Sequence, residues 1–129
     1  MQLFLDTVVA YQSLALILAT IVRRMGVYLF DQYTLLHIAV GILAYFWSVP
    51  FLIGMGIHIA FELIENTEWG VRAINRYIID PGWIMWPGGK YVTDTMMNQI
   101  GDNLGFASGW GLAWWLDSIG RRLGWYPTG

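Results

Sequence analysis

The chain has 129 residues, of which 57% are hydrophobic and 12% are charged, and its formal net charge is −2. Soluble domains average about 25% charged residues, so this composition predicts an all-α membrane protein; the alternative is a soluble helical domain with an unusually apolar core. A net negative charge with only seven basic residues argues against a nucleic-acid partner. The absence of cysteine excludes disulfides and thiolate metal sites.

Apolar runs along the chain predict a polytopic transmembrane helix bundle of about four spans, forming one domain over residues 1–129. A helix needs about 20 mostly apolar residues to cross a bilayer. One long apolar run is interrupted at Ser48, Val49 and Pro50, and we divide it there because proline is tolerated at the start of a helix but not in its interior. The predicted spans are residues 3–22, 32–47, 50–68 and 93–116.

Between the last two spans, residues 69–90 alternate Trp, Arg, Tyr and Pro-Gly pairs with short apolar patches. This pattern predicts an interfacial segment that lies on the bilayer surface. Arg76 in this segment either binds phosphate or anchors the segment at the surface. Five of the seven basic residues fall on one side of the four-span topology, which the positive-inside rule places in the cytoplasm. We therefore expect a multi-pass protein of the cell inner membrane.

The last span carries polar residues along one face of its helix. At 100° per residue, Asp94, Asn98 and Asp102 share this face. Three glycines continue the same face at a spacing of four residues, which allows another helix to approach closely: Gly101, Gly105 and Gly109. The sequence leaves open whether this glycine face packs within one chain or between two copies in a homo-oligomer or larger membrane assembly.

The second and third spans supply polar partners at the same depth. His37 lies near the start of the second span, and the third span carries a polar face at its end, formed by His58, Glu62, Glu65 and Asn66. Two helices joined by a short turn run antiparallel, so the start of the second span lies level with the end of the third. We therefore expect the polar groups of three helices to converge in one half of the membrane.

This convergence predicts a divalent-metal site, because carboxylates packed together without a cation repel each other. Oxygen ligands favour Mg²⁺ or Mn²⁺, whereas an imidazole favours Mn²⁺, Fe²⁺ or Zn²⁺. The predicted ligands are Glu62, Glu65, Asp94, Asp102, His37 and Asn98. The predicted further binding residues are Asn66, His58 and Arg76.

Three functions remain open for the polar cluster. In the first, the metal supports hydrolysis or group transfer on a lipid or a phosphorylated small molecule, with His37 and Asp102 as the catalytic residues. In the second, the cluster conducts protons or ions, because chains of intramembrane acids and histidines mark such paths. In the third, it is a hydrogen-bonded polar core of a structural membrane subunit.

Several motifs over residues 34–109 resemble an uncharacterised bacterial family of small integral membrane proteins. The motifs are HIAVG, FELIEN, Arg76-Tyr77 and TDTMMNQIGDNLG. The family pattern is H-x-x-x-G, then E-L-x-E-N, then R-Y, then G-D-S-x-x-N-S-x-x-x-D, from which Thr93 and Gln99 depart. More distantly, the series resembles YjdF-like and VanZ-like membrane proteins. The resemblance implies a common site at these positions but brings no established reaction.

Overall fold

The structure is a computed structural model that describes residues 26–81 and 92–126. The predicted span at residues 3–22 lies outside the described residues. The described part of the chain is all-helical. Its elements are α2 (Thr34–Phe46), α3 (Phe51–Glu65), α4 (Glu68–Ile74), the π-helix η1 (Asn75–Ile79) and α5 (Met96–Arg122).

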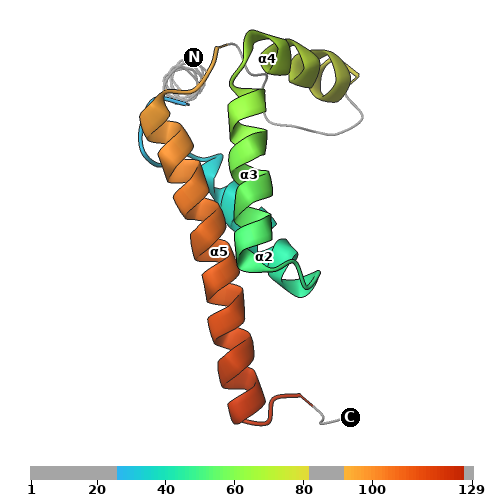
Figure 1. Cartoon of the computed structure of the whole chain (residues 1–129), viewed down its shortest axis with the longest axis vertical. Helices are drawn as coiled ribbons and strands as arrows, with labels where there is room; N and C mark the ends of the chain where they lie inside the picture. The colour runs from blue at the N-terminus through green and yellow to red at the C-terminus, as the bar shows by residue number, and fades with distance from the viewer. Residues whose placement is uncertain (1–25, 82–91, 127–129) are drawn as a thin grey trace, which may run out of the picture.

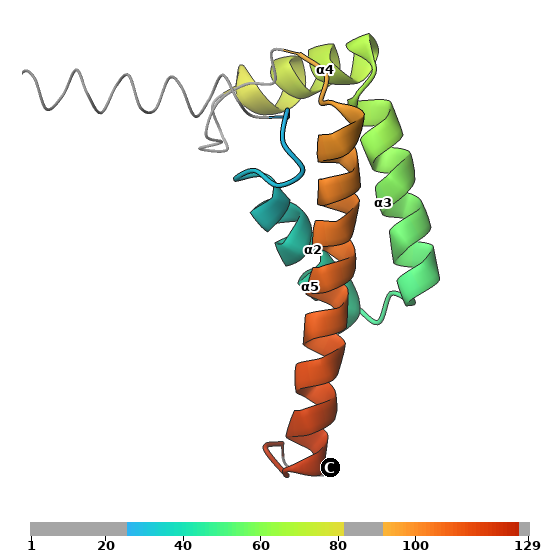
Figure 2. The same cartoon turned by 90° about the vertical axis from the view of Figure 1, so that its left-hand side faces the viewer.

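The three longer helices lie side by side, and α5 extends well beyond the other two at its C-terminal end (Figures 1 and 2). A tight turn between α2 and α3 reverses the chain, with Ser48 at a positive φ of 59° and Pro50 directly before α3. At the other end of α3, α4 and η1 lie across the end of the helices where α5 begins (Figure 1). The start of α2, the end of α3 and the start of α5 therefore meet at one end.

Short side-chain caps fix where α4 and α5 begin. The Thr67 hydroxyl accepts a hydrogen bond from the Gly70 backbone N–H at the start of α4, and Thr95 accepts one from the Asn98 N–H at the start of α5. Such caps satisfy backbone donors that have no partner within the helix. Within the segment 69–90, predicted as an interfacial turn and loop, residues 69–79 are helical in α4 and η1, and residues 82–90 lie outside the described residues.

No helix of the described residues is both long enough and apolar enough to cross a membrane. The 13 residues of α2 and the 15 residues of α3 extend about 20 and 22 Å at 1.5 Å per residue, against a hydrocarbon core of about 30 Å. The 27 residues of α5 are long enough, but they include Asp102, Asp117 and Arg121. The prediction of a polytopic transmembrane bundle is therefore wrong, and so is the multi-pass location in the cell inner membrane that followed from it.

Glycines allow α5 to approach α2 and the segment before it. A Cβ atom on Gly41 of α2 would collide with the backbone carbonyl oxygen of Phe106, and one on Gly109 of α5 would collide with that of Ile38. A Cβ atom on Gly101 would likewise collide with the Leu29 carbonyl oxygen. The glycine face of α5 thus packs within the chain, which the sequence had left open.

The space between the helices is lined mostly by small and polar residues, together with the buried ring of Phe106. Thr34 of α2, His58 and Glu62 of α3, and Asn98 and Asp102 of α5 are buried. Large apolar side chains lie mainly on the outer faces, for example Leu35, Val40, Leu52 and Ile57. The polar interior is therefore the feature of this fold that needs a chemical explanation, because buried polar groups are costly unless they are paired or bind an ion.

Candidate metal centre

Two histidines and a glutamate meet between α2 and α3. His58 and Glu62 lie four residues apart on α3 and therefore face the same way, and both are buried, with 5% and 2% exposed surface. His37 Nδ1 of α2 lies 2.9 Å from His58 Nε2 and 3.4 Å from Glu62 Oε1. One ligand atom from each of the three residues lies within 4.8 Å of the others, so the group could hold a metal ion.

A second group shares Glu62 and adds Asp94, which lies two residues before α5, and Asp102 in the second turn of α5. Each of Glu62, Asp94 and Asp102 has one carboxylate oxygen within 4.8 Å of those of the other two. This group could therefore also hold a metal ion. Asp102 Oδ1 accepts a hydrogen bond of 2.7 Å from the Thr34 hydroxyl. Asp102 Oδ2 lies 3.7 Å from His37 Nε2. His37 therefore belongs to the first group through Nδ1, and its Nε2 faces Asp102 of the second group.

Burial determines the electrostatics of the centre. It raises the pKa of Asp102 from 3.8 to about 6, although the Thr34 hydrogen bond opposes the shift, and the nearby charges of Asp31, Asp94 and Glu65 raise the pKa further. Burial lowers the pKa of His58 below its usual value, against the opposing effects of Asn103 and Glu65. Both buried groups are thus shifted toward their neutral forms, which is the form in which an imidazole binds a metal.

Asn66 connects the end of α3 to the start of α5. Its side-chain Nδ2 donates to the Glu62 backbone oxygen at 3.0 Å and to Glu62 Oε2 at 3.3 Å. Its Oδ1 accepts a 2.7 Å hydrogen bond from the Asp94 backbone N–H. Asn66 therefore positions Glu62 and the backbone of Asp94 relative to one another.

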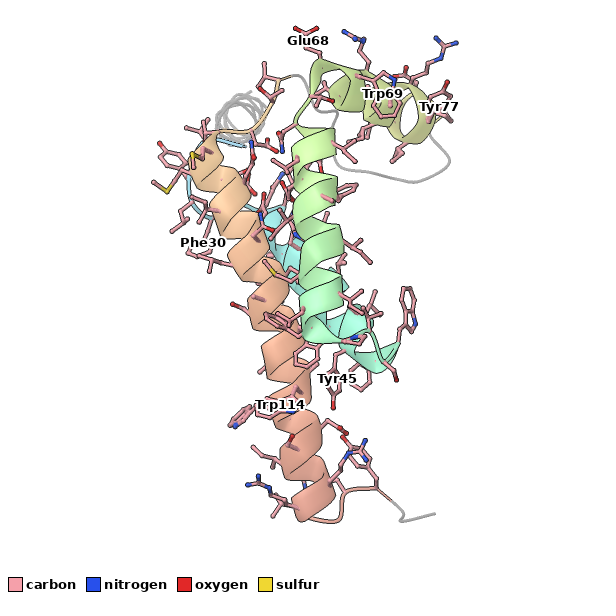
Figure 3. The ribbon with its side chains drawn as sticks, in the orientation of Figure 1. Phe30, Tyr45, Glu68, Trp69, Tyr77 and Trp114 are labelled. Atoms are coloured by element: carbon pink, nitrogen blue, oxygen red, sulfur yellow. The ribbon has the colours of Figure 1, made fainter. Side chains whose placement is uncertain are left out.

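Besides Asn66, three residues predicted for the site lie outside both groups. The Asn98 side chain is buried and donates to the Tyr28 backbone oxygen at 2.9 Å, so it holds the segment before α2. Glu65 is half-buried at the end of α3. Arg76 is exposed on η1, with its guanidinium carbon 6.0 Å from the centre of the Tyr77 ring. Figure 3 shows Tyr77 beyond the end of α3, away from the space between α3 and α5.

The sequence-based site list omitted two residues that contact the centre. Thr34 bonds to Asp102, and Asn103 Oδ1 lies 3.1 Å from His58 Nδ1. Thr34 precedes His37 by three residues on the same helix, so the helical period alone places the two on neighbouring positions. Asn103 lies about 100° around the helix from Asp102, which removed it from the face that the sequence analysis considered.

Comparisons with models of known protein families, with curated protein sequences and with solved structures find no match for this chain. The resemblance drawn from the sequence motifs therefore stays a prediction.

Proposed function

We propose that the chain binds one divalent transition-metal ion through His37 Nδ1, His58 Nε2 and a carboxylate oxygen of Glu62. The observation that carries this proposal is the meeting of two imidazole nitrogens and a buried carboxylate from two helices within 4.8 Å. Two histidines and one carboxylate are the protein ligands of many catalytic Zn²⁺ sites and of non-haem Fe²⁺ sites.

The distances between the donor atoms support this ligand set. Metal–nitrogen bonds of about 2.0–2.1 Å at tetrahedral angles place two donor atoms about 3.3 Å apart. His37 Nδ1 and Glu62 Oε1 are 3.4 Å apart, and His37 Nδ1 and His58 Nε2 are 2.9 Å apart. A cation between them requires only a small opening of the histidine pair.

The mixed nitrogen and oxygen ligands favour Zn²⁺ or Fe²⁺ over Mg²⁺, which prefers oxygen ligands alone. A metal held by three protein ligands keeps positions open for water or substrate, where it polarises an oxygen or activates water. The reaction class that we propose is accordingly hydrolysis or group transfer. The sequence predicted His37 both as a ligand and as the acid–base group, and this assignment keeps only the role of ligand.

Equilibrium dialysis with measurement of bound metal tests the proposal. The EDTA-treated protein is dialysed against Zn²⁺, Fe²⁺ without oxygen, Mn²⁺ or Mg²⁺, and bound metal per chain is determined by elemental analysis. We expect one Zn²⁺ or Fe²⁺ per chain, and at least tenfold weaker binding for His58→Gln.

Asp94→Asn serves as the matched variant because Asp94 belongs only to the carboxylate group. We expect its Zn²⁺ affinity to stay within about threefold of wild type, since the change removes one nearby charge but no ligand. Loss of metal in Asp94→Asn together with full binding in His58→Gln would assign the ion to the carboxylates instead. Absence of binding by the wild-type protein would reject the metal site altogether.

A further inference from the structure

The orientation of the Asn103 amide follows from its two neighbours. The Gln99 backbone oxygen lies 2.7 Å from Asn103 Nδ2 and can only accept, so the amide nitrogen faces it and donates. Asn103 Oδ1 therefore faces His58 Nδ1, at 3.1 Å, and accepts from it. A neutral His58 accordingly carries its proton on Nδ1, and its Nε2 is left with a lone pair directed toward His37.

Asp102 has the corresponding relationship to His37. Thr34 donates to one carboxylate oxygen of Asp102 at 2.7 Å, which fixes the carboxylate in place. The other oxygen lies 3.7 Å from His37 Nε2, while His37 Nδ1 faces His58 and Glu62. The distance of 3.7 Å is too long for a hydrogen bond. The two ring nitrogens of an imidazole form their bonds in diverging directions, so Nε2 points away from the side on which Nδ1 meets His58 and Glu62. Separation of His37 from His58 by a cation would bring Nε2 closer to Asp102.

We infer that Asp102 and Asn103, consecutive residues of α5, are positioning residues for the two histidines. In the metal-bound protein each would hold the proton-bearing nitrogen of one imidazole, so that the opposite nitrogen of each ring faces Glu62. The inference rests on the proposed function, because it assigns outer partners to the proposed ligands. Such partners fix the tautomer and orientation of metal-bound histidines, and their loss typically weakens metal binding 10- to 100-fold.

The inference has a consequence for the proton of His37. Because His58 Nε2 has no proton, the 2.9 Å contact between the two rings requires one on His37 Nδ1. A metal bound at Nδ1 would displace this proton, and the neutral ring would then carry its proton on Nε2 and donate a hydrogen bond from there to the Asp102 carboxylate. The number of protons on His37 is unchanged, and only its tautomer differs between the metal-free and metal-bound protein.

Nitrogen NMR measures these tautomers directly, because the chain contains only two histidines. The full chain, labelled with ¹⁵N-histidine, is compared at pH 8 after EDTA treatment and after addition of Zn²⁺. Without zinc we expect a proton on Nδ1 of both rings. With zinc we expect Nδ1 of His37 and Nε2 of His58 to show metal-bound shifts, and the His37 proton on Nε2.

Two variants separate positioning from a general effect on α5. Asn103→Leu removes the acceptor for His58 Nδ1, and we expect a mixture of His58 tautomers and 10- to 100-fold weaker Zn²⁺ binding. Ser118→Ala is the control, because Ser118 also donates to a backbone oxygen four residues earlier on α5 but lies far along the helix from the centre. We expect wild-type tautomers and affinity for the control.

The outcomes distinguish the inference from the proposed function. A proton on His58 Nε2 in the wild-type protein overturns the inference whether or not zinc binds. Zinc bound through His37 Nε2 and His58 Nδ1 overturns the inference but supports the metal site. Wild-type tautomers and affinity in Asn103→Leu also overturn it. A protein that binds no zinc refutes the proposed function, and the inference with it.

Discussion

Asp102 Oδ2 of α5 lies 3.7 Å from Nε2 of His37 on α2, with both side chains largely shielded from solvent. The other oxygen of Asp102 is bonded to Thr34, one turn before His37. One carboxylate thus contacts two residues of the same face of α2. Burial disfavours the charged form of this carboxylate and raises its pKa to about 6.

Asp102→Asn is expected to stabilise the metal-free protein at pH 8. The pKa of Asp102 is raised from 3.8 to about 6. Ionisation of this carboxyl therefore lowers the free energy of unfolding as the pH rises from about 4 to 6, and the loss stays constant at higher pH. A shift of this size corresponds to at most about 3 kcal/mol. The variant removes this penalty, so its unfolding free energy should exceed that of wild type at pH 8 and approach it near pH 4.

Urea unfolding of both proteins in EDTA at these two pH values measures the difference. The same substitution should weaken Zn²⁺ binding 10- to 100-fold, because the variant loses the carboxylate charge that favours a proton on His37 Nε2. Equal or lower stability of Asp102→Asn at pH 8 would contradict the stated role of burial.

Gly109→Ala should destabilise the protein, whereas Gly111→Ala on the same helix should not. A Cβ atom on Gly109 would collide with the backbone carbonyl of Ile38, but one on Gly111 meets no atom within 4 Å. Overpacking costs about 1–3 kcal/mol, while alanine in place of an unobstructed helical glycine gains about 0.5–1 kcal/mol. Denaturant unfolding of the two variants tests this, and equal effects would show that the α2–α5 contact does not depend on the glycine.

Tyr45→Phe is expected to alter the acid dependence of stability. The Tyr45 hydroxyl of α2 donates to Asp117 of α5 at 2.5 Å, and Arg121 donates to the same carboxylate oxygen at 2.9 Å. Figure 3 shows Tyr45 near the lower end of α3, beside α5. These bonds lower the pKa of Asp117, with the Tyr45 hydrogen bond as the largest cause.

A lowered pKa means that the contribution of Asp117 to stability is complete above its unfolded pKa of about 4 and is lost as pH falls through the folded value. We expect thermal unfolding of Tyr45→Phe to occur a few degrees below wild type at pH 7. The difference should shrink as the pH is lowered below 4. A difference that is independent of pH would exclude the charged hydrogen bond as its cause.

Removal of zinc is expected to lower the unfolding midpoint of the wild-type protein. A ligand that binds only the folded state at 100 times its dissociation constant stabilises that state by about 2.7 kcal/mol. Glu62→Gln should show no such response to zinc or EDTA, because it lacks the carboxylate shared by both candidate groups. Glu68→Gln is the control, since Glu68 is exposed on α4, and its response should match that of wild type.

The helical arrangement of the chain follows largely from local signals in the sequence. The break at Ser48 to Pro50 separates α2 from α3, and the spacing of Asn98 and Asp102 places both on one face of α5, whereas Asp94 lies before the helix begins. The prediction that was wrong placed these helices in a membrane. A high apolar content predicted membrane spans, but helix length depends on turns and caps, and the helices within residues 26–81 and 92–126 are too short or too polar to cross a membrane.

The sequence predicted most of the residues of the candidate site, but not which of them lie next to each other. Helical periodicity brought His37, Glu62 and Asp102 to one end of the fold, yet it treated His58 as a minor participant and Glu65 as a ligand. The difference depends on the rotation of α3 about its axis, which buries His58 and Glu62 and leaves Glu65 half-buried. Rotation of a helix by part of a turn follows from packing and is not encoded in the spacing of polar residues alone.

The most direct test of the account is X-ray absorption spectroscopy at the zinc edge of the zinc-loaded wild-type protein. The account predicts one zinc per chain with nitrogen and oxygen ligands at about 2.0–2.2 Å and outer-shell scattering from two imidazole rings. A shell of oxygen ligands without imidazole scattering would contradict it and assign the ion to Glu62, Asp94 and Asp102. A protein that retains no zinc would contradict the metal site itself.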